Sequence, residues 1–251
     1  MQNINWGKVK GIIGKFGLCA KQTLTVHRPT VTSHMKKEMM TINKLFDLLD
    51  DWRNLPAYQL ERRADIFFAI HLENIIEKIL GTKVDLIIPE FPVRVGEISE
   101  KHPELNKSFK IDYLTYSKNE NKVYLIELKT DQRSRREKQD WYLESASKIK
   151  VKGLVSGLLK IYNATNQKVK YDNLLDKIEK IGWIKRDNKT IKNLNIEIEP
   201  SIIYIQPLNK GNEELIISFD NIINALSDSS DLLTKRFIES LKKWKSDTNA
   251  R

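Results

Sequence analysis

The chain has 251 residues, of which 40% are hydrophobic and 30% charged, and its formal net charge is +10. This length can bury a substantial core. No apolar run reaches the length of a membrane-spanning helix, so membrane insertion is not expected. The positive charge favours a polyanionic partner, but charge alone does not separate nucleic acid from an anionic membrane. The single cysteine, Cys19, excludes an intrachain disulfide and is typical of a reducing, cytoplasmic setting.

Residues 1–34 differ in composition from the rest of the chain. They contain five Lys or Arg residues and no acid, so they carry half of the net charge. We interpret them as a basic N-terminal arm that is disordered or loosely attached. The arm lacks the continuous apolar run of a secretory signal. The regular apolar pattern that starts at Met35 predicts a helix over about 35–54, and residues 35–251 are expected to form a single domain.

The apolar periodicity of residues 57–80 predicts a long amphipathic helix. A helical projection places Asp65 in the middle of the apolar face and Glu61 beside it. Two acids on a buried stripe are costly unless a metal ion or a cation accompanies them. Glu61 is therefore our first candidate for an additional site acid and Asp65 the second. The alternative is that both acids are favoured by the helix dipole and pair with Arg62 or Arg63.

The most informative segment lies between residues 110 and 129. Two runs rich in β-branched, aromatic and aliphatic residues flank a polar, Asn-rich turn, which predicts a β-hairpin. Asp112 lies in the first run, and Glu127 and Lys129 end the second. Because alternate residues of a strand share a face, Glu127 and Lys129 point the same way, about 6.6 Å apart along the strand. The neighbouring strand can bring Asp112 beside them.

Two carboxylates with a lysine suit the hydrolysis of a phosphodiester. Mg²⁺ prefers hard oxygen ligands and commonly binds one or two carboxylates together with substrate phosphate. Asp112 and Glu127 would supply the carboxylates and the backbone carbonyl of Leu128 a third oxygen, with Mg²⁺ or Mn²⁺ as the cofactor. Such a metal ion activates water and neutralises charge on the phosphoryl oxygens. Lys129 would orient the attacking water or stabilise the developing negative charge.

Similar acid-x-Lys triplets occur at residues 120–122 and 187–189, but both lie in polar, turn-like sequence. Only the triplet that begins at Glu127 ends an apolar strand and follows an Asp-bearing strand. The alternative interpretation of this triplet is a solvent-exposed salt bridge at a sheet edge.

A basic segment follows the hairpin directly. Ser134 and Glu137 have the spacing of a capping box, which predicts a helix that begins there and runs to about Tyr162. Its first turns would place side chains that bind phosphates next to the site. The candidate nucleic-acid-binding residues are Arg133, Arg135, Arg136, Lys138, Gln139 and Tyr142. The alternative is an ordinary solvated basic face.

The rest of the chain predicts further alternating elements. These are a helix over 168–185, strands over 201–205 and 214–219, and closing helices over 220–227 and 231–245.

The motif Ile111-Asp112, a gap of fourteen residues and Glu127-Leu128-Lys129 resembles the PD-(D/E)XK nuclease superfamily, with Ile111 where the proline that names the family would stand. The resemblance covers about residues 56–206. It implies an α/β fold with a restriction-endonuclease-like core, in which a mixed central sheet is flanked by helices in the order α-β-β-β-α-β. It also implies a glutamate from the first core helix at the metal site, and a Gln and a Tyr on the helix after the lysine.

We therefore expect a Mg²⁺-dependent deoxyribonuclease. Two alternatives stay open: a catalytically silent nucleic-acid-binding module, and a basic scaffold protein whose main partner is another protein. The sequence does not distinguish endonuclease from exonuclease action, DNA from RNA, or a monomer from a homodimer.

Overall fold

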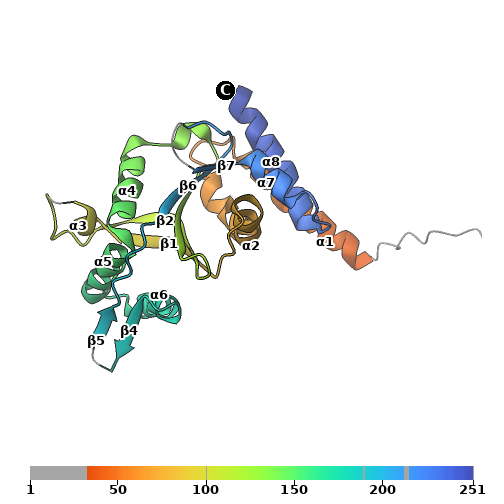
Figure 1. The fold of residues 1–251 in the computed structure, drawn as a ribbon. Coiled ribbons are helices and arrows are strands. Elements are labelled where there is room, and N and C mark those ends of the chain that lie inside the picture. Colours follow the sequence, from red (N-terminus) through yellow and green to blue (C-terminus); the bar gives the residue numbers. More distant parts are fainter. Residues whose placement is uncertain (1–32, 100, 189, 212–214, 251) are drawn as a thin grey trace, which may run out of the picture.

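The computed structural model describes residues 33–99, 101–188, 190–211 and 215–250 (Figure 1). The predicted basic arm over 1–34 therefore lies outside the described residues, apart from the backbone of its last two.

The described residues form a mixed α/β fold around a five-stranded sheet with the strand order β1-β2-β3-β6-β7. Strand β2 pairs antiparallel with both β1 and β3, whereas β6 pairs parallel with β3, and β7 parallel with β6. The parallel pairing of β3 with β6 requires a long crossover connection, which the helical segment between them supplies. The strands of this sheet are β1 (Leu86–Arg94), β2 (Ser108–Ser117), β3 (Lys122–Leu128), β6 (Ser201–Gln206) and β7 (Leu215–Ser218).

The predicted hairpin and the two predicted C-terminal strands are confirmed, as is the mixed sheet between helices. Strand β1 was implied only by the expected order of elements. It contains Pro89 and Pro92, which a central strand would not tolerate because proline lacks the N–H needed for the ladder. Since β1 is an edge strand, only one of its sides must pair.

Helices cover both faces of the sheet, each over its own hydrophobic cluster (Figure 1). One cluster packs α2 and α7 against the sheet, with α1 and α8 outside them, and includes Phe68 and Phe237. The other packs α4, α5 and α6 against the opposite face and includes Leu154 and Trp183. The helices are α1 (Ser33–Trp52), α2 (Leu60–Leu80), α3 (Val95–Ile98), α4 (Glu137–Lys148), α5 (Lys150–Ala164), α6 (Lys168–Lys180), α7 (Phe219–Leu226) and α8 (Leu232–Ala250).

Several predicted helix bounds were wrong. The helix expected from Ser134 to Tyr162 is two helices, because the backbone turns at Lys150, where φ is +60°. The helix expected over 168–185 ends at Lys180, and Gly182, with φ of +79°, leads into a hairpin of β4 (Ile184–Asp187) and β5 (Thr190–Asn193). A left-handed residue cannot continue a right-handed helix.

A charge cluster around the buried Arg236 ties α1 to α8. Arg236 donates to Asp47 at 2.6 Å and to Asp50 at 3.2 Å, and Trp244 donates to Asp50 at 2.9 Å. Burial alone would raise the pKa of Asp50, but hydrogen bonds from α8, with Lys243 first, outweigh it and lower that pKa. This cluster joins the first described helix to the last one.

Asp50→Asn is expected to lower the free energy of unfolding by about 2 kcal/mol. Breaking a buried ion pair costs about 3–5 kcal/mol when a charge is left alone, and Asp47 remains as a partner of Arg236. Because the folded-state pKa of Asp50 is lowered, its contribution is present above the unfolded pKa near 4 and is lost as the pH falls. Urea denaturation at neutral and acid pH measures both effects. Asp51→Asn, at an exposed neighbouring position, is the matched control, and equal stability of the two variants would contradict the assignment.

Candidate active site

The site lies where strands β2 and β3 diverge. Their backbone ladder ends at the pair Tyr113 and Ile126. Beyond it, the Asp112 carboxylate takes the place of a backbone acceptor, because its Oδ2 accepts a hydrogen bond of 2.7 Å from the Leu128 N–H. This contact fixes the Asp112 side chain against the end of β3, as the predicted hairpin required.

Glu127 and Lys129 lie on the same face and are both buried, with 1% and 4% of their surfaces exposed. The Lys129 Nζ donates to Glu127 Oε1 at 2.5 Å, and Gln139 Nε2 donates to the same oxygen. Strand β3 lies in the middle of the sheet, and the Lys129 N–H donates to the Ile205 carbonyl of β6 at 2.7 Å. The alternative of a solvent-exposed salt bridge at a sheet edge is therefore wrong.

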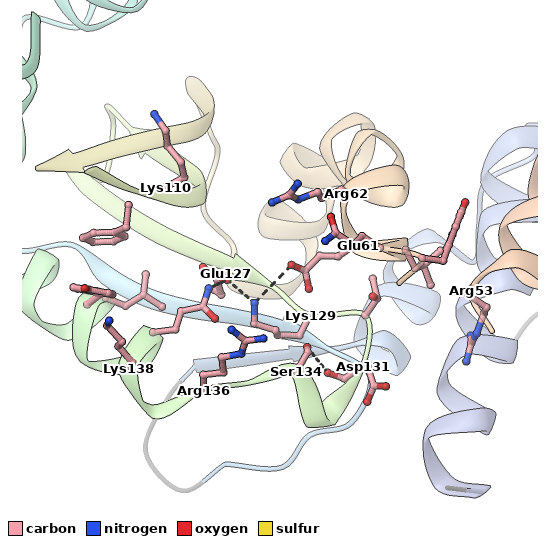
Figure 2. A pocket seen from close by; sticks show the side chains of 18 residues that line it. Arg53, Glu61, Arg62, Lys110, Glu127, Lys129, Asp131, Ser134, Arg136 and Lys138 are labelled. Carbon is pink, nitrogen blue, oxygen red and sulfur yellow. Dashed lines mark hydrogen bonds and ion pairs between the residues drawn. The ribbon is translucent and has the colours of Figure 1, made fainter. Parts of the chain in front are cut away.

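The first turn of α2 contributes a second acid near the lysine. Glu61 Oε1 lies 3.8 Å from Lys129 Nζ, and its side chain is 32% exposed. Figure 2 shows Lys129 reaching toward both Glu127 and Glu61. The structure therefore brings Asp112, Glu127, Lys129 and Glu61 to one place.

Asp65 does not lie on the buried stripe of α2, so its predicted position was wrong. Its side chain is exposed, and its Oδ1 accepts from the Ile66 N–H at 2.7 Å. The buried stripe of α2 runs through Ala64 and Phe68 and leaves Ile66 exposed. It is rotated by about one residue around the helix from the stripe that apolar spacing predicted, which was centred on Asp65. The backbone carbonyl of Asp65 accepts from the Tyr113 hydroxyl at 2.7 Å, which holds α2 against β2.

Burial makes the negative charges of the site costly. Burial raises the pKa of Asp112, and the same effect, reinforced by the nearby Asp112, raises the pKa of Glu127 to about 8. Burial also raises the pKa of Glu61. Buried neighbouring carboxylates favour a shared proton, a cation or a metal ion. Within the described part of the chain, no group of three or more His, Cys, Asp or Glu side chains is arranged to hold a metal ion.

The capping box predicted for the following helix was wrong. Ser134 lies in a short 3₁₀ helix (Gln132–Ser134), and its hydroxyl donates to the Asp131 carbonyl at 2.7 Å. Helix α4 begins only at Glu137, after an extended Arg136. The capping interaction fails because the helix begins at Glu137, with Arg136 at the N-cap position, so Ser134 lies two residues ahead of that position.

The candidate phosphate-binding residues separate into two groups. Arg136, Lys138, Gln139 and Tyr142 line a cleft of about 700 Å³ that also holds Glu127, Lys129 and Glu61. Arg135 does not line it; its Nε donates to the Asp140 carboxylate at 3.0 and 3.1 Å, and its guanidinium lies 4.1 Å from the centre of the Tyr204 ring. The side chain of Arg133 lies outside what the structure describes.

Three cations of the cleft were not predicted as binding residues: Arg53, Arg62 and Lys110. They come from the end of α1, from α2 and from β2 (Figure 2). No local sequence signal groups them, because only the tertiary fold brings these elements to one cleft. Together with Lys129, Arg136 and Lys138, they make the cleft rich in positive charge.

Comparisons with protein-family models, with curated proteins and with solved structures found no match for this chain. Across the residues that the structure describes, no helix is both long enough and apolar enough to cross a membrane.

Proposed function

We propose that the protein is a metal-dependent nuclease of the PD-(D/E)XK type. The observation that carries the proposal is the convergence of Asp112, Glu127 and Lys129 at the end of β3, where Glu127 and Lys129 line a cleft rich in cations. The order α2, β1, β2, β3, α4 and α5, then β6 supports it, since it follows the α-β-β-β-α-β order that the resemblance implies, with the short α3 between β1 and β2 and with α6, β4 and β5 inserted before β6.

The donor set suits a hard divalent cation. Asp112 and Glu127 offer carboxylate oxygens that are costly to bury as anions, and Leu128 offers a backbone carbonyl at the strand end. These residues would hold Mg²⁺ or Mn²⁺. When bound, the ion would supply charge neutralisation at the phosphate and an activated water.

Side chains around the metal site would supply the other roles in catalysis. Lys129 would place a positive charge at the phosphoryl oxygens, because its Nζ already lies against the carboxylates. Gln139 would orient the Glu127 carboxylate by donating to Oε1. Glu61 would serve as a second partner for Lys129 and so fix its position.

Incubation with supercoiled, linear and single-stranded DNA, and with RNA, in Mg²⁺, Mn²⁺ or EDTA tests the proposal. Cleavage in the divalent metals that EDTA abolishes is the expected result. Binding without cleavage of any substrate in either metal would favour the silent binding module instead.

Metal affinity is expected to rise with pH. Burial raises the pKa of Asp112 and raises that of Glu127 to about 8, so Glu127 retains its proton below about pH 8 and a metal ion must displace it. Apparent Mn²⁺ affinity should therefore be weaker at pH about 6 than at pH about 9, by up to about tenfold per pH unit for each proton displaced. Calorimetry in buffers of different ionisation enthalpy would count the protons. An affinity that does not change with pH would contradict this expectation.

A further inference from the structure

The cleft has two walls that carry the same kinds of side chain. One wall comes from the connection between α1 and α2, which includes Arg53 and Tyr58, and from the first turn of α2, which includes Arg62. The opposite wall comes from β2 and α4 and includes Phe109, Lys110, Lys138 and Tyr142. Figure 2 shows Lys110 and Lys138 on one side of Lys129, and Arg53 on the other. Positive charge therefore continues on both sides of the candidate catalytic centre.

Aromatic rings accompany the cations on both walls. The rings of Phe109 and Tyr142 stack with centroids 4.7 Å apart and an interplanar angle of 17°, and Lys138 Nζ lies 5.7 Å from the Tyr142 centroid. Across the cleft, Tyr58 lines the other wall, and its ring centre lies 4.9 Å from the guanidinium of Arg63, which is outside the cleft lining. Cations that follow a backbone, interleaved with aromatic rings, are the chemistry that binds single-stranded nucleic acid.

The position of these rings distinguishes an unpaired strand from a duplex. In a duplex the bases are stacked inside and the phosphates lie outside, so rings within a cleft reach a base only when it has left the helix. The cleft volume, about 700 Å³, is also in the range of pockets that enclose small ligands, about 300–1,000 Å³. That space suits a short stretch of one strand.

We propose that the cleft takes an unpaired DNA strand that passes from one wall to the other across Glu127 and Lys129, so that cleavage occurs inside the strand. The bases would stack on Tyr58 and on the Phe109–Tyr142 pair, and the cations of both walls would bind phosphates on either side of the bond that breaks. The cleavage step rests on the proposed nuclease function, whereas the binding mode does not. Hydrolysis would add water across one internal P–O bond and leave two strand ends.

Binding is measured separately from cleavage, by fluorescence anisotropy on labelled single-stranded and duplex DNA in Ca²⁺ over a salt series. Arg53→Gln with Arg62→Gln removes the cations of one wall, and Lys110→Gln with Lys138→Gln removes those of the other. Each pair should weaken single-strand binding about tenfold and reduce the salt slope by about 1.4, since each phosphate contact contributes about 0.7. Lys235→Gln with Lys242→Gln, exposed on α8 and outside the cleft lining, is the control of equal charge. An effect from only one wall would overturn the path through the cleft.

The aromatic contribution is tested in the same assay. Tyr142→Leu should weaken single-strand binding about tenfold and leave duplex binding nearly unchanged, because it removes a stacking surface and no charge. Tyr171→Leu is the control of equal side-chain change, since Tyr171 lies on α6 and does not line the cleft. Equal losses for single strand and duplex, or equal effects of the two variants, would overturn the unpaired strand as the ligand.

The site of cleavage is tested with circular single-stranded DNA in Mn²⁺. The expected first product is the full-length linear strand. Intact circles beside linear strands that shorten from an end would overturn internal cleavage and leave the nuclease proposal standing. The expected binding pattern with no cleavage of any substrate would instead overturn the nuclease proposal and leave the unpaired strand as the ligand.

Discussion

Glu127→Gln is expected to reduce Mg²⁺-dependent cleavage by about 10³-fold, the equivalent of the several kcal/mol that metal-assisted charge stabilisation contributes. Glutamine has nearly the same shape, and its Oε1 can still accept from Lys129 and Gln139, so the packing of this buried position should persist. What it lacks is the negative charge that a divalent ion requires. The initial rate of cleavage of a labelled strand, with thermal unfolding in parallel, measures both properties.

The chain offers a matched control for this substitution. Glu120 belongs to a second Glu-x-Lys triplet and pairs with Lys122 at 2.6 Å, but it lies in an exposed turn. Glu120→Gln should therefore cleave at the wild-type rate. Asp112→Asn should behave like Glu127→Gln, because asparagine can still accept from the Leu128 N–H. A wild-type rate in either site variant would remove that residue from the metal site.

The central hairpin could be predicted because the residues that determine it lie close together in the sequence. Strand alternation places Glu127 and Lys129 on one face, whatever the rest of the fold does. The short turn fixes the register of β2 against β3 and so brings Asp112 within reach of Leu128. Residues that are close in sequence and joined by a tight turn have few other ways to meet.

The parts that could not be predicted depend on distant contacts. The outward position of Asp65 reflects which side of α2 meets α7 and the sheet, and apolar spacing alone did not resolve it. Arg135 was predicted to bind phosphate because it is basic. In the structure it pairs with Asp140 and lies over the ring of Tyr204 in β6, which the local sequence does not indicate. The break at Lys150 depends on a left-handed backbone turn that propensity does not reveal.

Lys129→Met is expected to reduce the rate of cleavage by about 10³-fold, while most of the affinity for single-stranded DNA remains. Methionine fills a similar volume but supplies no charge where negative charge develops. Binding should survive because Arg53, Arg62, Lys110, Arg136 and Lys138 also line the cleft, so the salt slope should fall by no more than about 0.7. Anisotropy in Ca²⁺ and cleavage rates in Mg²⁺ separate the two quantities.

Lys129→Met also removes a buried hydrogen-bond partner of Glu127. Without Lys129, Glu127 loses one of its hydrogen-bond donors, and its carboxyl will hold its proton to a higher pH, because the lysine opposes the rise of that pKa. The variant should therefore be assayed at pH about 7 and about 9, and Lys122→Met, at the exposed second triplet, is the control. Recovery of the wild-type rate at the higher pH would mean that Lys129 acts only by keeping Glu127 ionised. A deficit that persists at both values, with affinity retained, would instead place the lysine at the reacting phosphate.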